Sequence, residues 1–427
     1  MKHLVVVLRE YYPTYGATGN CIKNLIDILK NDYEVSIIAC KTEFESEDYI
    51  MNEGVDIYRV NDFRNCFYQY IKNRKKNNRY NIADRMIFIL VRFLSILYTT
   101  LRINSIQRTL QRRFENKLSL IHFGKNIDVI ISVAQPYEAS LAALNFCETH
   151  KDVKSYSIVF DHLSENTTLN RYKMLKKMRY PSNIQIEKRI VKSNNYTFIL
   201  PHMQNHYLKK FKDYNYKYKS IEHPLLIEHK SDLKTNILDF KDDDINLVYA
   251  GMLDKTMRNP RHFLNIMAGL EIRDIKFHVF HMGNCDQLVN EYVKLLNGRV
   301  VNYGKVNLDV SLEAMMKSDI LVNFGVINGN QISGKIFDYF SMGKPIIHLY
   351  FFDEDPNLQY FDKYPNSICI KIDENNLSKN TKDVYQFIHD NKYKKVHFKD
   401  VENIFFNATP GYVANQIMNR LEESNDN

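Results

Sequence analysis

The chain carries two successive series of short apolar segments, each separated by longer stretches with helical periodicity. Continuous apolar runs such as 4–8 are typical of parallel strands that are buried on both faces. The first series of predicted strands comprises 4–8, 35–40, 57–60, 129–133, 155–160 and 196–200. The second comprises 246–250, 276–280, 300–303, 320–324, 345–350 and 367–372. This alternation predicts an α/β chain with two doubly wound parallel sheets, each covered by helices on both faces.

The two series meet in the polar stretch 223–244, which contains Pro224 and has no sustained apolar period. A length of 427 residues also exceeds what one hydrophobic core usually serves. We therefore predict a first domain at 1–228, a second at 229–405 and a final helical segment at 406–427. Ligands of open α/β sheets bind beyond the carboxyl ends of the strands, so we expect a site where two such edges face each other.

The composition is ordinary for a globular protein, with 44% apolar and 25% charged residues. The six cysteines form no CxxC pair and have no histidine at metal-ligand spacing, which is typical of reduced core thiols. The apolar run at the N-terminus has no small-residue cleavage site and is interpreted as a strand. These features favour a cytoplasmic protein without a bound metal.

The most specific pattern is the segment 330–347, which reads NQISGKIFDYFSMGKPII between two predicted strands. Ser333, Gly334 and Lys335 would open its helix, where free N–H groups, the positive end of the dipole and a lysine favour a diphosphate. Asp338 follows one turn later, and its carboxylate can accept hydrogen bonds from vicinal ribose hydroxyls. The alternative is a plain amphipathic helix with its apolar residues in the core.

A second pattern follows the predicted strand 246–250. Gly251 ends this strand, where a glycine lets a ligand or another backbone come close. Lys255 and Arg258 lie a few residues further on, within reach of an anionic group. Either residue could neutralise that group, and we favour Arg258 because it precedes Asn-Pro. A simple surface lysine is the alternative interpretation.

Other strand ends carry weaker signals. Gly283, Gly304 and Gly16 lie in turns after predicted strands, and glycine is routine at such turns. Asp161 and His162 directly follow the strand 155–160, where catalytic residues of such sheets collect. We favour His162 as a hydrogen-bond donor and take Asp161 as the second candidate. A helix-capping aspartate is the structural alternative.

With these motifs in this order, the chain resembles the GT-B glycosyltransferases, and in particular the retaining family 4-like group of bacterial surface-polysaccharide assembly. The similarity is carried by Ser-Gly-Lys-Ile-Phe-Asp-Tyr at 333–339, followed by Gly-Lys-Pro-Ile. The E-x7-E pattern of that family falls on Asn330 and Asp338. The resemblance implies two Rossmann-like domains that face a central cleft, and a last helix, near 411–423, that crosses back to the first domain.

The resemblance also implies roles for the candidate residues. Asp338 would hold the donor ribose, Lys335 the donor phosphates, and Lys255 or Arg258 the charge of the leaving diphosphate. Asp161 or His162 would contact the acceptor or the sugar. Asn330 departs from the family, because the first acid contacts the sugar in many relatives, and this leaves the sugar open. The remaining donor-binding candidates are Gly16, Gly251, Gly283, Gly304, Gln331, Ser333 and Gly334.

The activity implied is transfer of a sugar, with retention, from a nucleotide-diphosphate sugar to a glycan or a lipid-linked acceptor. The leaving phosphate itself would help to deprotonate the acceptor, so no cofactor and no metal are expected. Two alternatives stay open. One is a non-catalytic partner with this fold that binds a glycosyltransferase or a glycan. The other is a nucleotide-sugar epimerase, for which paired catalytic acids are expected.

Positive charge is concentrated in one segment. The whole chain has a net charge of +8, and 64–118 alone holds 13 basic against 2 acidic residues. Within it, 86–97 is strongly apolar but too short to span a membrane. Such a helix can lie in an anionic membrane surface, at the inner face of the cell membrane, or can pack within its own domain with solvated arginines. No nucleic-acid-binding module accompanies the charge.

Overall fold

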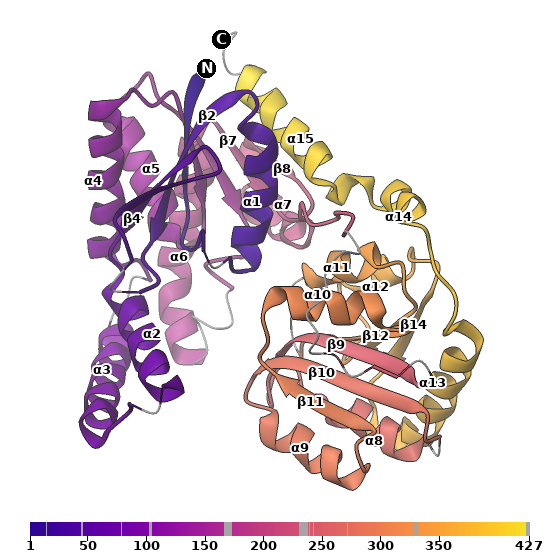
Figure 1. The fold of residues 1–427 in the computed structure, drawn as a ribbon. Coiled ribbons are helices and arrows are strands. Elements are labelled where there is room, and N and C mark those ends of the chain that lie inside the picture. The colour runs from indigo at the N-terminus through magenta and orange to yellow at the C-terminus, as the bar shows by residue number, and fades with distance from the viewer. Residues whose placement is uncertain are drawn as a thin grey trace. The chain divides into compact units, whose positions relative to one another are not determined.

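The computed structural model describes residues 1–423 apart from 14, 44–45, 78, 102–104, 166–172, 230–237, 239, 242, 271, 328 and 330–331. The chain divides into two compact units. The first comprises Met1–Pro224 together with Pro410–Asn427, and the second comprises Leu225–Thr409. Each unit contains one sheet flanked by helices (Figure 1), which confirms the predicted α/β class with two doubly wound sheets.

The first sheet has the strand order β3-β4-β2-β1-β5-β6-β7-β8. All pairs are parallel except β3–β4, an antiparallel edge pair that the sequence pattern did not predict. Its strands are β1 (Lys2–Val7), β2 (Tyr33–Cys40), β3 (Tyr49–Asn52), β4 (Val55–Val60), β5 (Val129–Val133), β6 (Lys154–Val159), β7 (Tyr196–Ile199) and β8 (Tyr218–Ser220). The central strands β1 and β5 are buried on both faces, in agreement with their unbroken apolar runs.

Helices of the first unit are α1 (Ala17–Leu29), α2 (Phe63–Lys76), α3 (Ile82–Leu101), α4 (Arg108–Gly124), α5 (Tyr137–Thr149), α6 (Lys173–Ser193), α7 (Gln204–Lys210) and α15 (Pro410–Glu423). The last helix, α15, packs against α1 and so belongs to the first unit although it ends the chain (Figure 1). A core cluster joins α4 and α5 to the sheet, with Phe114 and Leu118 fully buried.

α2 and α3 form a separate helical pair within the first unit (Figure 1). They contact each other through the Tyr68 and Phe88 rings, whose centroids are 5.9 Å apart, and through an ion pair of 2.7 Å between Arg74 and Asp84. The apolar side chains of the first part of α3 are between 49% and 80% exposed: Ile82, Met86, Ile87, Ile89, Leu90, Phe93 and Leu94. The apolar side chains of this part of α3 are therefore not explained by packing within their own domain. Among the described residues, none of the helices has the length and hydropathy needed to cross a membrane.

The second sheet is entirely parallel and has the order β11-β10-β9-β12-β13-β14. Its strands are β9 (Ile245–Leu253), β10 (Ile275–Gly283), β11 (Val300–Gly304), β12 (Ile320–Phe324), β13 (Ile346–Tyr350) and β14 (Ser367–Lys371). The chain runs outward from β9 in one direction and then resumes at β12 on the other side of β9. The β9–β12 boundary is therefore the topological switch point, where ligands of such sheets bind.

Helices of the second unit are α8 (Arg261–Gly269), α9 (Asp286–Leu295), α10 (Leu308–Lys317), α11 (Lys335–Ser341), α12 (Leu358–Phe361), α13 (Leu377–Asn391) and α14 (Phe398–Ile404). A core cluster that includes Phe263, Phe277 and Phe324 packs α8, α9 and α13 against one face of the sheet. α11 follows β12 and is fixed to β9, because the Tyr339 hydroxyl lies 3.1 Å from the Ala250 N–H. This contact brings the predicted helix of the 330–347 motif to the switch point.

Candidate functional site

The loop after β9 is folded into a tight turn at the switch point. Asp254 and Arg258 form an antiparallel bridge, with backbone hydrogen bonds of 2.9 and 3.0 Å. The Asp254 carboxylate accepts hydrogen bonds from the backbone N–H groups of Thr256 and Met257 and from the Asn284 amide. The turn is thus anchored both internally and to the end of β10, and it holds Arg258 in a defined place.

The two basic residues of this turn differ in environment. Lys255 is exposed, and its backbone N–H donates to the Asn284 side chain at 2.8 Å. Arg258 is half-buried, and its Nε is buried without a hydrogen-bond partner among the described residues. Burial raises the pKa of Tyr249 to about 12, and the nearby Arg258 charge opposes that rise. Arg258 therefore interacts with Tyr249 but keeps its buried Nε unsatisfied, whereas Lys255 is exposed.

Lys335 and Asp338 lie on the first turns of α11, with the Lys335 ammonium 3.5 Å from the Asp338 carboxylate. Burial raises the pKa of Asp338, although Lys335 and His229 both pull it down. α11 has only seven residues, so positive charge at its start comes mainly from the Lys335 side chain. Both side chains are partly exposed and remain accessible to a ligand.

His229 is a neighbour of this pair that the sequence patterns did not indicate. Its Nε2 is buried and has no hydrogen-bond partner among the described residues. Burial lowers the pKa of His229, while the Asp338 charge raises it and the Lys335 charge lowers it. The imidazole is thus within electrostatic reach of the pair on α11. No pattern of spacing connects residue 229 with 335–338, so only the fold reveals it.

A buried chain of polar groups supports the loop before α11. His348 lies 3.7 Å from Asp355, whose carboxylate accepts hydrogen bonds from the backbone and the side-chain amide of Asn357. The Oδ1 of the Asn357 side chain in turn accepts the Ser333 N–H at 2.9 Å. Burial alone would raise the pKa of Asp355, but His348 and Asn357 lower it below its usual value. Ser333 is therefore fixed by strand β13 and the segment after it.

The remaining donor-binding candidates of the second unit fall at the predicted strand ends. A Cβ on Gly251 would lie 2.7 Å from the Tyr249 hydroxyl, so this glycine makes room for a side chain of its own strand. Gly283 has a φ of +125°, and a Cβ there would lie 1.9 Å from the Leu253 carbonyl oxygen, which makes it a structural requirement. Gly304 ends β11, and Gly334 precedes α11 as its N-cap. Asn330 and Gln331 lie outside the described residues.

In the first unit the switch point lies between β1 and β5. Gly16 is the N-cap of α1 at the end of the loop after β1. Asp161 follows β6; its carboxylate accepts a short hydrogen bond from the Gln135 amide, and its carbonyl accepts the Tyr137 hydroxyl at 2.6 Å. Asp161 is therefore bound to Gln135 in the loop after β5 and to Tyr137, the first residue of α5.

His162 lies in a group of histidines near the same edge. Its ring centroid is 4.3 Å from that of His206 and 6.2 Å from that of His202. Burial lowers the pKa of His162 to about 4, and the two neighbouring imidazoles add to this effect. At neutral pH His162 is therefore uncharged, and its Nδ1 is buried without a hydrogen-bond partner among the described residues.

Two Rossmann-like units in one chain, with candidate residues at the switch point of each sheet, define the class of protein: the chain has the GT-B fold. Solved structures confirm this over its whole length. Sucrose-phosphate synthase from Thermosynechococcus elongatus has a TM-score of 0.66 at 11% identity, covering 99% of each chain. A mutant of S. aureus TarM, solved with UDP, has a TM-score of 0.58 at 10% identity and 99% coverage of each chain.

The fold is also shared with enzymes of other activity. UDP-GlcNAc 2-epimerase from Methanocaldococcus jannaschii has a TM-score of 0.53 at 12% identity, covering 99% of this chain and 100% of that one. The sequence itself matches no protein-family model and no curated protein. At such low identities the similarities establish the fold, and the activity has to be argued from the site.

Proposed function

We propose that the chain is a glycosyltransferase whose second unit binds the nucleotide diphosphate of a sugar donor at the β9–β12 boundary. One observation carries this proposal: Arg258 lies in the loop after β9, and Lys335 and Asp338 lie at the start of α11, which Tyr339 fixes to β9 at the switch point of a GT-B fold. The Arg258 Nε is buried without a hydrogen-bond partner among the described residues. Two cations suit the charge of a diphosphate, and the Asp338 carboxylate suits the vicinal hydroxyls of ribose.

In the proposed reaction, an acceptor hydroxyl oxygen forms a bond to the anomeric carbon while the bond from that carbon to the diphosphate oxygen breaks. Arg258 and Lys335 stabilise the negative charge that develops on the leaving diphosphate. The leaving phosphate oxygen takes the acceptor proton, so the sugar is transferred with retention and without a protein base. The acceptor is a glycan or a lipid-linked glycan of surface-polysaccharide synthesis, and Asp161 or His162 of the first unit contacts it.

The test is calorimetric titration of the purified chain with UDP, GDP and dTDP, followed by incubation with the matching nucleotide sugars. Binding of one nucleotide together with release of that nucleotide from its sugar supports the transferase. Binding without turnover would identify a non-catalytic partner. Conversion of UDP-GlcNAc into its 2-epimer, followed by NMR, would identify an epimerase, the activity of one solved structure with this fold. No binding of any nucleotide contradicts the proposal.

The exposed helix α3 supports a place for the protein on an anionic membrane surface. The side chains of Met86, Leu90 and Phe93 are 56–68% exposed and recur at helical spacing, and the exposed Arg85 and Arg92 lie among them. A helix that is apolar, basic and too short or too polar to span can bury its apolar side chains among lipid headgroups. Such a location suits an enzyme that acts on a lipid-linked acceptor at the inner face of the membrane.

Flotation with liposomes tests this location. The wild type is expected to float with anionic vesicles at low salt and to lose this association at high salt or with zwitterionic vesicles. Replacing Arg79, Arg85 and Arg92 with Glu removes about 1 kcal/mol of attraction per side chain, so binding should fall by roughly 100-fold or more. Arg74 is left intact because it pairs with Asp84.

A matched control replaces Leu120 and Phe123 with Ser, because these side chains of α4 are 59% and 93% exposed but lie outside the α2–α3 pair. This control is expected to float like the wild type. Equal and salt-insensitive recovery of the wild type in the soluble fraction would contradict membrane association.

A further inference from the structure

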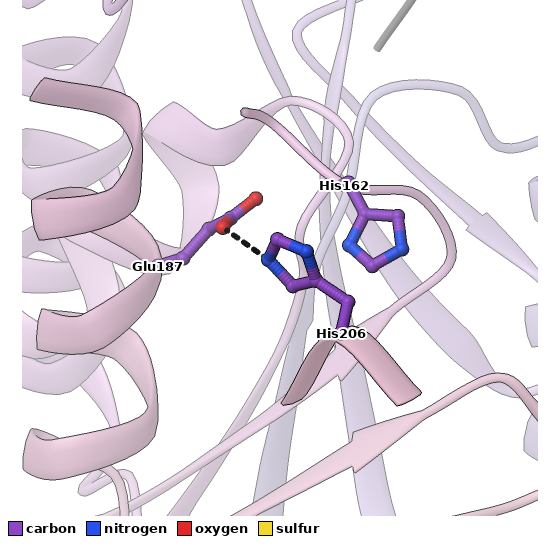
Figure 2. A group of neighbouring side chains, drawn as sticks. All are labelled: His162, Glu187 and His206. Atoms are coloured by element: carbon purple, nitrogen blue, oxygen red, sulfur yellow. Dashed lines mark hydrogen bonds and ion pairs between the residues drawn. The ribbon is translucent and has the colours of Figure 1, made fainter. Parts of the chain in front are cut away.

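Three side chains of the first unit gather around one point: His162, Glu187 and His206 (Figure 2). They come from the loop after β6, from α6 and from α7, respectively. One potential ligand atom of each lies within 4.8 Å of the other two. The Glu187 side chain is completely buried, and the His206 side chain is 8% exposed. A carboxylate and two imidazoles are thus enclosed together inside one compact unit.

The spacing within this group resembles that of metal ligands more than that of a hydrogen bond. The His206 Nε2 and the Glu187 Oε2 are 3.4 Å apart, whereas N–H···O bonds are usually near 2.9 Å. Two ligand atoms at about 2.0–2.1 Å from one tetrahedral zinc ion would be separated by about 3.4 Å. Glu187 and His206 can therefore hold an ion with almost no movement. The ligand atom of His162 lies within 4.8 Å of theirs, so a small rotation of the His162 side chain would complete the site.

The surroundings of the group orient its ligand atoms. The Glu187 Oε1 accepts hydrogen bonds from the N–H groups of Leu163 and Ser164 at 2.7 and 3.0 Å. The His206 Nδ1 lies 3.5 Å from the Glu165 carboxylate. A ligating histidine typically points its second nitrogen at a carboxylate in this way, which fixes the ring and increases its basicity. The Glu187 Oε2 also accepts the Ser164 hydroxyl at 3.0 Å, and it faces the His206 Nε2 at 3.4 Å.

The His162 imidazole is the third potential ligand of the group. Its buried Nδ1 has no hydrogen-bond partner among the described residues, which is costly for a buried polar atom. An ion at the centre of the group would bind two imidazoles and one carboxylate and relieve the unsatisfied nitrogen.

We propose that His162, Glu187 and His206 bind one divalent transition-metal ion of the zinc class. Two imidazoles favour such an ion over magnesium or calcium, which prefer oxygen ligands. Three protein ligands leave the fourth tetrahedral position to a water molecule or another oxygen ligand, as in catalytic zinc sites. The site belongs to the first unit, whereas the proposed donor residues belong to the second, and it departs from the sequence-based expectation of a chain without metal. With His162 as a metal ligand, Asp161 is left as the acceptor contact of the proposed transferase.

Metal titration of the full chain tests the proposal. Protein stripped with a chelator and dialysed is titrated with Zn²⁺ in competition with a chromophoric chelator, and separately with Co²⁺ while the visible spectrum is recorded. The wild type is expected to bind one equivalent, to give the intense bands of four-coordinate Co²⁺ and to melt at a higher temperature with Zn²⁺. The His206→Gln variant should bind Zn²⁺ at least about 100-fold more weakly and lose the Co²⁺ spectrum.

Two further variants sharpen the result. Glu187→Gln retains an oxygen for the N–H groups of Leu163 and Ser164 but lacks the anionic ligand, so it should fold and bind Zn²⁺ weakly. The control His389→Gln alters a side chain that is 67% exposed in the second unit and should bind like the wild type. Substoichiometric Zn²⁺ binding by folded wild type overturns the proposal, as does equal affinity in folded His206→Gln. If that variant does not fold, a six-coordinate Co²⁺ spectrum of the wild type also overturns it.

Discussion

Replacement of Arg258 by Ala tests the core of the proposed donor site. The Arg258 side chain is half-buried, and its Nε has no hydrogen-bond partner among the described residues. The loop that carries it is closed by backbone hydrogen bonds between residues 254 and 258, which do not depend on the side chain. The substitution should therefore leave the fold intact and remove one charged donor from the switch point.

The expected loss follows from the kind of contact. A hydrogen bond that involves a charged group contributes about 1.5–3 kcal/mol, so Arg258→Ala should weaken binding of the correct nucleoside diphosphate by about 10- to 100-fold. Lys335→Ala should also weaken binding by a factor of about ten or more. Its loss should lie nearer the lower limit, because the Lys335 charge is already partly balanced by Asp338 at 3.5 Å. Lys255→Ala decides between the two basic residues of the loop, and we expect the smaller effect there.

Isothermal titration calorimetry with UDP and GDP measures these affinities directly. Arg273→Ala serves as a matched control. Arg273 is exposed and precedes β10, at the amino-terminal ends of the strands and opposite to the proposed site. This control should bind like the wild type. Unchanged UDP and GDP affinity in both Arg258→Ala and Lys335→Ala would refute the assignment, and a loss confined to Lys255→Ala would transfer the phosphate contact to that residue.

Three further predictions concern the second unit. Gly283→Ala should destabilise the unit by about 2 kcal/mol or more in urea unfolding, because its Cβ would clash with a backbone oxygen. The control Gly298→Ala is also at positive φ but lies in open space, so it should cost about 1 kcal/mol. Asn357→Ala should cost about 1–3 kcal/mol in the same assay and weaken nucleotide binding, since the Ser333 N–H loses its acceptor. Burial raises the pKa of Asp338, so its contribution to stability is present below the ordinary carboxyl pKa and is lost as the pH rises through the raised value. Thermal melts should therefore show Asp338→Asn gaining stability over the wild type as the pH rises above the ordinary carboxyl pKa of about 4.

The strands were predictable because their apolar runs are unbroken and bounded by polar turns. The range 320–324 predicted for β12 agrees with the structure at both ends, as does 129–133 for β5. β3 escaped prediction because it is a four-residue edge strand with alternating exposed positions, and β8 because it has three residues. Short edge strands depend on their neighbours for hydrogen bonds, and they have few buried positions, so their sequences show no clear apolar pattern.

Candidate site residues could be predicted where charged or polar residues follow a predicted strand closely in the sequence, as at Arg258 and at 333–338. It was not predictable where distant segments meet. His229 lies more than one hundred residues before Asp338, yet the two side chains interact electrostatically in the folded chain. The same holds for His206 and Glu187, whose helices are brought together by the order of β6 and β7 in the first sheet.

The distribution of acids in the second unit argues for transfer over epimerisation. An epimerase of this fold is expected to use paired catalytic acids, and the sequence has Asn330 where the first acid of the E-x7-E pattern would stand. Asp355 is a buried acid that contacts the loop before α11 through Asn357, but it is 4% exposed, lies beside His348, accepts two hydrogen bonds from Asn357 and has a lowered pKa. A carboxylate so constrained serves to position Ser333 and is a poor proton donor. Asp338 is partly exposed and lies 3.5 Å from the Lys335 ammonium, and a carboxylate beside a cation at the start of α11 suits the proposed binding of a donor better than paired acid catalysis.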